Sequence, residues 1–236
     1  MELWLLEQKD LFYRNFIEDQ RWKYLTSGVV VTLEVTFFAL ALGLVIGLIC
    51  AVIRTVYDQN KPDFPGFGLL NWLVQCYLTV IRGTPVVLQL LIGYFIIFVT
   101  STNMVLVASL VFGINSGAYI TEILRSGILS VDPGQAEAGR SLGLSYTETM
   151  GFIVIPQAFK TVLPTLANEC IALLKETAVC GYIGLTDLTK AGDIIRGRTF
   201  SAFMPLIAVA GIYLAIVMLL GKMTGILEQK LRAAER

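Results

Sequence analysis

The sequence contains no histidine among its 236 residues. Without an imidazole, Ser-His and Cys-His catalysis is excluded, and most zinc sites lose their usual ligand. No pair of cysteines has the CxxC spacing, and we interpret these side chains as small apolar residues: Cys50, Cys76, Cys170 and Cys180. Because no set of nucleophile and base remains, we expect neither catalytic residues nor a metal site, and we predict that the chain is not an enzyme.

Charge is also scarce. Charged residues make up 15% of the chain, against about 25% in a soluble domain. The 18 basic and 18 acidic residues cancel, so the charge gives no reason to expect nucleic-acid binding. Hydrophobic residues reach 56% and the mean hydropathy is +0.71. They gather in runs of roughly the 20 residues that cross a bilayer, so we predict an all-α, multi-pass membrane protein.

Five apolar stretches are candidate spans: 27–53, 67–99, 104–124, 152–174 and 202–220. The segment Arg82–Pro85 interrupts the second, and proline removes a helix hydrogen bond. We therefore predict one long helix there that is bent or broken, with two short helices as the alternative. Residues 57–66 contain two prolines and predict a break. Gly43 and Gly47 form a GxxxG that permits close helix approach, although chance explains such a pattern equally well.

The ends of the chain differ from its middle. Residues 1–26 mix apolar and charged side chains without a continuous apolar core, which argues against a cleaved signal peptide. We expect an interfacial amphipathic segment lying on the membrane, with a soluble partner helix as the alternative. Residues 223–236 form a basic tail. Lysine and arginine are similarly frequent at both ends, so the positive-inside rule does not set the orientation.

Polar side chains within the apolar stretches are costly, and therefore indicate function or structural pairing. The candidates for lining a path are Arg82, Gln89, Asn115, Tyr119, Glu122 and Asn168. Their cation, carboxylate and amides suit an amino acid, whose carboxylate and ammonium both need partners once desolvated. The alternative is that Arg82 pairs with Glu122 and only holds two helices together. Four more charges lie nearer span ends, where we favour snorkelling or helix-end roles: Glu34, Arg125, Glu169 and Glu176.

Residues 134–156 have the sequence GQAEAGRSLGLSYTETMGFIVIP. This segment resembles the EAA loop of ABC importer permeases, in which E-A-A, three residues, G and nine residues precede I-x-L-P. Glu137, Ala138 and Gly139 fill the first three places, and Gly143 follows at the required distance. Gly139 replaces an alanine, and Ile155 replaces the leucine. Both departures keep small or apolar character.

The resemblance extends over residues 27–222. The segments that carry it, in family order, are RGTPVVLQL (82–90), AYITEILRSGILSVDPGQAEAGRSLG (118–143), PQAFKTVLPTLANE (156–169) and ALLKETAV (172–179). As a set they are similar to the histidine/glutamine/arginine-type permeases of polar amino acid uptake. The resemblance implies a type I ABC importer permease fold, with about five transmembrane helices and a cytoplasmic coupling helix in the loop 132–156.

The same resemblance implies which residues contact a separate ATPase subunit: Gln135, Glu137, Ala138, Gly139, Leu142 and Gly143. We expect one helix from Gln135 to about Met150, with Gly139 and Gly143 on a face that a partner can approach closely. Placing this loop in the cytoplasm puts the N-terminus outside and the C-terminus inside. The location implied is the bacterial cytoplasmic (inner) membrane.

The chain has no G-x-x-x-x-G-K-[ST] motif, because Ile216 stands where a glycine should precede Gly221-Lys222. ATP and Mg²⁺ are therefore expected in a partner ATPase dimer, and no cofactor in this chain. The other implied partners are a second permease copy or a sister permease, and an extracytoplasmic amino-acid-binding protein. An ion-coupled secondary amino acid transporter is the alternative function. The sequence does not name the amino acid, since Glu122 suits a basic substrate unless Arg82 neutralises it.

Overall fold

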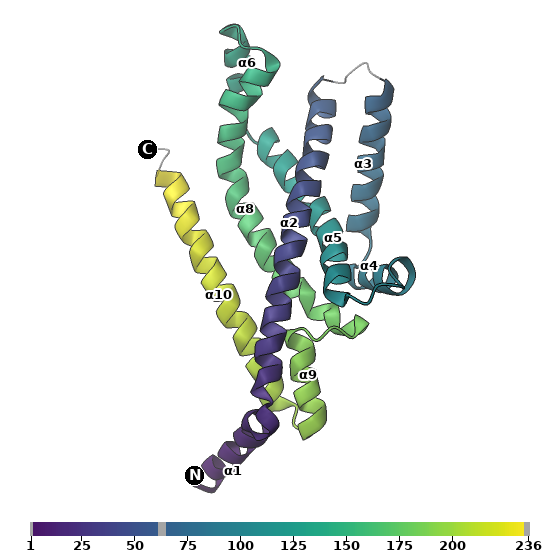
Figure 1. Cartoon of the computed structure of the whole chain (residues 1–236). Coiled ribbons are helices and arrows are strands. Elements are labelled where there is room, and N and C mark those ends of the chain that lie inside the picture. The colour runs from purple at the N-terminus through teal and green to yellow at the C-terminus, as the bar shows by residue number, and fades with distance from the viewer. Residues whose placement is uncertain (1, 61–64, 234–236) are drawn as a thin grey trace. The chain divides into compact units, whose positions relative to one another are not determined.

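The computed structural model describes residues 2–60 and 65–233 (Figure 1). Within these ranges all regular structure is helical, as predicted. The main helices are α1 (Glu2–Phe12), α2 (Trp22–Asn60), α3 (Pro65–Gly83), α4 (Val86–Ile92), α5 (Met104–Leu129), α6 (Pro133–Ser141), α7 (Tyr146–Thr149), α8 (Ile155–Glu176), α9 (Leu188–Thr199) and α10 (Phe203–Ala233). Of the break predicted at 57–66, residues 57–60 and 65–66 are helical, so the prediction is wrong for them, and residues 61–64 lie outside the described residues. Residues 234–236 of the predicted tail also lie outside them.

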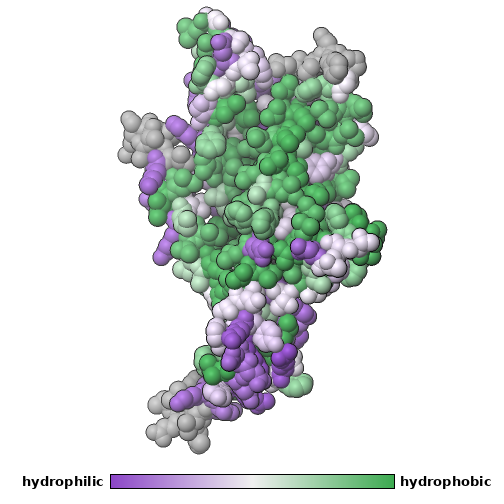
Figure 2. All heavy atoms as spheres, viewed as in Figure 1, coloured by the Kyte–Doolittle hydropathy of each residue, from purple (hydrophilic) through white to green (hydrophobic). Residues whose placement is uncertain are grey.

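Four helical stretches are long and apolar enough to cross a membrane: Trp22–Gln59, Met104–Leu129, Tyr146–Ile183 and Phe203–Lys230. A fifth candidate is the pair Gly66–Gly83 and Val86–Ile97, which is broken at Pro85, as predicted. Large apolar side chains such as Phe37 and Val52 are exposed on these helices, and Figure 2 shows a largely hydrophobic surface over them. Such a surface suits lipid.

The predicted end of the first span at Ile53 is wrong. Helix α2 continues through Arg54 to Asn60. Arg54 Nη2 lies 3.6 Å from Asp58 Oδ1 one turn later, and Arg54 Nη1 donates a hydrogen bond of 2.8 Å to Asn71 Oδ1 on α3. Arg54, the charged residue directly after the predicted end, is therefore paired with Asp58 in the same helix, which lets α2 continue.

The chain forms two compact units, each built from three stretches of sequence. The first unit comprises 1–39, 86–112 and 172–220, and the second comprises 40–85, 113–171 and 221–236. Helices α2, α5, α8 and α10 each contribute residues to both units.

Glycines set the contact between α2 and α5 within the second unit. A Cβ placed on Gly43 would lie 3.2 Å from the backbone nitrogen of Gly117, and one on Gly47 would lie 2.4 Å from Ile120 Cγ2. Larger residues at these places would push the helices apart. The GxxxG of the sequence therefore has a packing role within the chain.

Helix α9 lies in the core of the first unit. Its apolar face and its neighbours form one buried cluster: Phe16, Leu25, Leu188, Ala191, Ile195 and Val209. The backbone N–H of Leu188 donates a hydrogen bond of 3.2 Å to Thr32 Oγ1 on α2. Close approach there depends on Gly28, since a Cβ on it would lie 2.8 Å from Leu188 Cα. The start of α2 and the start of α9 are thus packed backbone to backbone.

Candidate functional site

Arg82 lies in the last turn of α3 and meets a polar face of α5. Its Nη1 lies 3.7 Å from Glu122 Oε1, and its guanidinium lies 5.7 Å from the ring centroid of Tyr119. The Arg82 and Glu122 side chains are 44% and 28% exposed, so the pair remains accessible. Three of the six predicted path residues are therefore brought together.

Glu122 is shared with a second arginine. Arg125 Nη2 lies 3.4 Å from Glu122 Oε2, and Arg125 Nη1 lies 3.1 Å from Asp58 Oδ2, which belongs to α2. Asp58 in turn pairs with Arg54. Alternating charges thus connect α3, α5 and α2, and three guanidinium groups face two carboxylates, leaving an excess of one positive charge. Arg125, for which snorkelling or a helix-end role was expected, bridges two acids; the expectation itself stays a prediction.

A groove of about 280 Å³ lies beside this pair. Its lining is predominantly polar and comprises Arg54, Gln75, Leu78, Thr79, Arg82 and Glu122. Gln75 and Thr79 lie one turn apart on α3, so they add an amide and a hydroxyl to the guanidinium groups. The groove therefore offers donors for a carboxylate and one carboxylate for a cation.

The other predicted path residues are placed differently. Asn115 lies on α5 one turn before Tyr119 and is buried, with 3% of its surface exposed. Asn168 is exposed on α8, and Gln89 lies on α4 in the other unit. Glu169, beside Asn168, accepts a hydrogen bond of 2.9 Å from Ser116 Oγ on α5. It therefore links two spans, and the helix-end role expected of it is wrong.

The ion pairs within α2 and within α5 have a detectable signal in the sequence. Arg54 and Asp58 are four apart, and Glu122 and Arg125 are three apart, which are the spacings of paired charges on one helix face. The link between the two pairs, from Arg125 to Asp58, joins residues 67 positions apart. Only the packing of α2 against α5 reveals it.

The coupling segment begins with a well-capped helix. Asp132 precedes α6, and its Oδ1 accepts a hydrogen bond of 2.8 Å from the N–H of Gly134. The helix ends at Ser141, and Gly143 follows with a φ of +86°, a left-handed conformation that favours glycine. Ser145 then caps α7. The single helix predicted from Gln135 to Met150 is therefore wrong, because the chain reverses its backbone conformation at Gly143.

The two glycines of this segment do not share a partner-facing surface, contrary to prediction. Gly139 is buried, and a Cβ on it would lie 2.8 Å from Ile153 Cδ1 and 3.0 Å from Thr149 Cγ2. It lets α6 pack on the following helical segment of the same chain. Gly143 is exposed, with no atom within 4 Å of an added Cβ, and serves the turn.

The remaining predicted coupling residues are exposed on or beside α6: Gln135, Glu137, Ala138 and Leu142. Leu142 is 82% exposed, although leucine is normally buried. Gln135 Oε1 accepts a hydrogen bond of 3.3 Å from Gln157 Nε2, which fixes one side of the helix to the chain. Glu137 and Leu142 remain exposed, so a carboxylate and an apolar side chain are available for another protein to contact.

Across residues 2–60 and 65–233, no group of three His, Cys, Asp or Glu side chains is arranged to hold a metal ion. The predicted absence of a cofactor in this chain stays a prediction.

Comparison with known proteins gives consistent matches. Residues 43–233 match the family described as "Binding-protein-dependent transport system inner membrane component". The chain is 32% identical to the arginine transport system permease protein ArtQ of Bacillus subtilis, with 89% of this chain and 93% of ArtQ covered. It is 30% identical to the L-cystine transport system permease protein TcyB of the same species, with 92% and 90% covered. A crystal structure of an amino acid ABC transporter with histidines contains a chain of similar fold, with a TM-score of 0.81, 36% identity, and coverage of 91% of this chain and 98% of that one.

Proposed function

Because this chain belongs to the family of binding-protein-dependent transport system inner membrane components, we propose that it is the membrane-spanning subunit of an ABC importer for polar amino acids. The predicted family and the all-α fold of an importer permease are confirmed. The main support for amino acids as the substrate class is the accessible cluster of Arg82, Tyr119 and Glu122 beside a polar groove. The names of its relatives include arginine and cystine carriers, which agrees with this substrate class.

In this proposal the substrate competes with the ion pair for its partners. The 3.7 Å between Arg82 and Glu122 exceeds a hydrogen-bond length, so the guanidinium keeps donors for an incoming carboxylate. The substrate ammonium, or a cationic side chain, would meet Glu122. Asn115 and Asn168 complete the proposed path within the second unit, and a role for Gln89 stays a prediction. A charge-assisted, two-point contact of this kind holds an amino acid by the groups that all amino acids share.

A double variant separates this role from simple bracing of α3 on α5. We expect Glu122→Gln with Asn115→Ala to lower the uptake rate about tenfold or more, as loss of a charged contact implies, and to change substrate preference. Glu34→Gln is the matched control, since Glu34 is an exposed carboxylate on α2 outside the groove. Unchanged uptake and preference in the folded double variant would assign Glu122 to bracing alone.

The energy would come from another subunit. We place ATP and Mg²⁺ in a partner ATPase dimer whose clefts receive α6 and Leu142, with no cofactor in this chain. A second copy or a sister permease would complete the membrane part. A binding protein would dock outside and deliver the amino acid. The N-terminus would lie outside and the C-terminus inside the bacterial cytoplasmic membrane. Closure of the ATPases would move the coupling segment, and the spans would alternate between outward and inward access.

The proposed coupling is tested by uptake in proteoliposomes that hold the chain, its ATPase and the binding protein. We expect ATP-driven amino acid uptake that Glu137→Lys abolishes while the complex still assembles, because the substitution reverses an exposed charge on α6. Glu7→Lys makes the same charge change on α1 and should leave uptake intact. Uptake that follows an ion gradient and ignores both ATP and Glu137 would identify a secondary transporter instead.

A further inference from the structure

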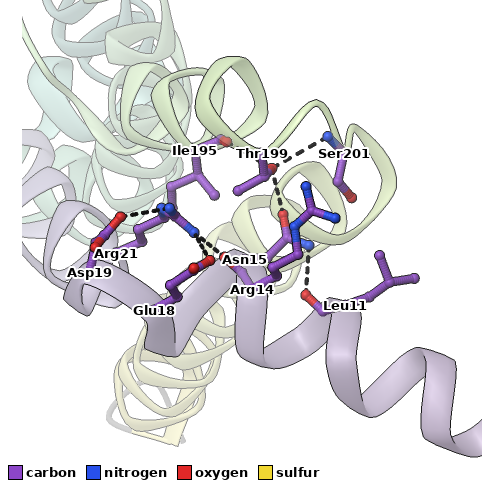
Figure 3. A network of polar contacts seen from close by, with 9 residues as sticks. All are labelled: Leu11, Arg14, Asn15, Glu18, Asp19, Arg21, Ile195, Thr199 and Ser201. Atoms are coloured by element: carbon purple, nitrogen blue, oxygen red, sulfur yellow. Dashed lines mark hydrogen bonds and ion pairs between the residues drawn. The ribbon is translucent and has the colours of Figure 1, made fainter.

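The residues that precede the first span have no part in the proposed transport cycle, yet they are folded onto α9. Asn15 is fully buried; its Nδ2 donates a hydrogen bond of 2.7 Å to the carbonyl of Leu11, and its Oδ1 accepts one of 2.8 Å from Thr199 Oγ1 (Figure 3). Phe16 belongs to the buried cluster that includes Ile195. Contacts that join residues 184 positions apart make this segment an integral part of the first unit.

A fixed corner separates this segment from α2. Asp19 and Gln20 have φ values of 52° and 55°, in the left-handed region that L-residues seldom adopt. The guanidinium of Arg21 is buried at this corner and contacts the carbonyl of Arg14, Glu18 Oε2 at 3.0 Å and Asp19 Oδ2 at 2.7 Å (Figure 3). The chain therefore changes direction here and is held in place, so α1 departs from the line of α2 (Figure 1).

Around this corner large apolar side chains are exposed. They are Phe12, Tyr13, Ile17 and Trp22, each with 46–56% of its surface exposed. Trp22 is the first residue of the first candidate span, and the ammonium of Lys23 lies 5.9 Å from its ring centroid. Aromatic residues and lysine at the end of a span are typical of the level of the lipid headgroups. Exposed aromatic and aliphatic side chains that directly precede and begin a candidate span in the sequence suit lipid better than a soluble protein.

We propose that Phe12, Tyr13, Ile17 and Trp22 bind the lipid headgroup region at the start of the first span, and that the contact of Asn15 with Thr199 thereby ties α9 to the membrane surface. This goes beyond the transport function and does not depend on which solute is carried. It specifies the surface on which residues 12–22 lie. Helix α9 would then be fixed on two sides, by the spans through its buried face and by the lipid-bound segment through Thr199.

Fluorescence of the intact permease–ATPase complex in nanodiscs tests the lipid contact. Trp4→Phe with Trp72→Phe leaves Trp22 as the single tryptophan of this chain; the tryptophans of the ATPase are replaced in the same way. We expect blue-shifted emission that loses much of its intensity when bromines are placed in the lipid close to the headgroups. Tyr13→Trp on a chain lacking the three native tryptophans should behave alike. Ser141→Trp on that chain, reconstituted in nanodiscs without the ATPase, is the aqueous control, because Ser141 is exposed at the end of α6 when no ATPase covers this helix.

Emission from Trp22 and Tyr13→Trp that matches the Ser141→Trp control would overturn the proposal. So would emission that becomes blue-shifted only when the binding protein is added, since a protein would then be the partner. A complex that shows no amino acid uptake but strong quenching would leave this inference standing while the proposed function fails. The two conclusions are thus tested apart.

Hydrogen exchange tests the link to α9. Thr199→Val removes the hydroxyl that contacts Asn15 and keeps the side-chain shape, although that hydroxyl also contacts the Ile195 carbonyl and accepts from the Ser201 N–H; Phe16→Ala, which leaves these bonds of Thr199 in place, is therefore the decisive variant. We expect α9 amides to exchange several-fold faster in nanodiscs, with Phe16→Ala producing a larger change of the same kind. Arg14→Ala is the control, because the Arg14 side chain is exposed and only its carbonyl is used. Unchanged exchange in both Thr199→Val and Phe16→Ala would show that the segment does not hold α9.

Discussion

Two short helices outside the spans begin in the same way and have opposite surroundings. Helix α6 starts after Asp132 and α9 starts after Asp187, and each aspartate side chain accepts backbone N–H groups of the first turn. Each helix also contains one tightly packed glycine, Gly139 or Gly192. Helix α9 nevertheless lies in the core of its unit, whereas α6 exposes most of its residues. The same local pattern can therefore serve internal packing or an external contact.

The two helices differ most in how deeply their capping aspartates are buried. Asp132 is exposed, but Asp187 is fully buried. Burial raises the pKa of the Asp187 carboxyl, although hydrogen bonds from the N–H groups of Thr189 and Lys190 oppose that shift. A cap that is buried cannot be replaced by water when it is removed, because water does not reach the freed N–H groups. The contribution of a capping aspartate to the free energy of unfolding thus depends on its burial. The sequence pattern of a helix cap does not show whether the cap is buried.

The strongest way to break the packing of α9 is at Gly28. A Cβ there would lie 2.8 Å from Leu188 Cα and 2.9 Å from the carbonyl oxygen of Asp187, and backbone atoms cannot rotate away. We expect Gly28→Leu to lower the free energy of unfolding by about 3 kcal/mol or more, seen as loss of monodisperse complex in detergent. Gly211→Leu on α10 is the control, since no atom lies within 4 Å of its Cβ. Equal yields of both variants would contradict the close contact.

Replacement of the capping aspartates should have the next largest effect on the free energy of unfolding. We expect Asp187→Ala to lower the free energy of unfolding by about 2–3 kcal/mol, because it removes a cap and leaves buried N–H groups unpaired. Asp132→Ala should cost only about 0.5–1 kcal/mol. Thermal unfolding of the two purified variants provides the measurement. Equal destabilisation would mean that burial does not separate the two caps.

The raised pKa of Asp187 also predicts a pH dependence. A carboxyl whose folded-state pKa lies above its ordinary value, about 3.9, binds its proton more tightly in the folded state. Its contribution to stability is full below that ordinary value and is lost as the pH rises through the folded pKa. We expect the stability gain on acidification to shrink in Asp187→Asn, which keeps an acceptor but does not titrate. An identical pH profile in Asp132→Asn and Asp187→Asn would refute the assignment.

Sequence alone predicts the spans and the broken second span, because apolar run length and proline are local signals. The pairing of Arg82 with Glu122 was only the alternative interpretation of these two residues, and the structure shows it. The sequence does not predict the sharing of Glu122 with Arg125 or the link from Arg125 to Asp58. Those contacts depend on how α2 packs against α5, and the glycines that allow this packing are also common where helices do not meet.

The coupling segment illustrates the same limit at short range. The predicted helix from Gln135 to Met150 is wrong because Gly143 adopts a positive φ. The sequence does not show whether a glycine within a helical pattern will adopt a positive φ. Gly139 was expected to face a partner and instead packs on Ile153. Small residues show that something approaches closely, but they do not show whether it belongs to the same chain.

We expect the smallest effect on stability at Leu142. A substitution there tests whether the exposed surface of α6 has a function that the buried surface of α9 does not have. Its side chain is 82% exposed, so Leu142→Ser should change the free energy of unfolding by only about 0.5 kcal/mol or less. Leu188→Ser, at a fully buried position of α9, should unfold its unit. We expect Leu142→Ser to weaken assembly with the ATPase, measured by pull-down and by the coupling of ATP hydrolysis to uptake. If Leu142→Ser instead destabilised the isolated chain and left assembly intact, α6 would resemble α9 after all, and its exposed face would have no partner to meet.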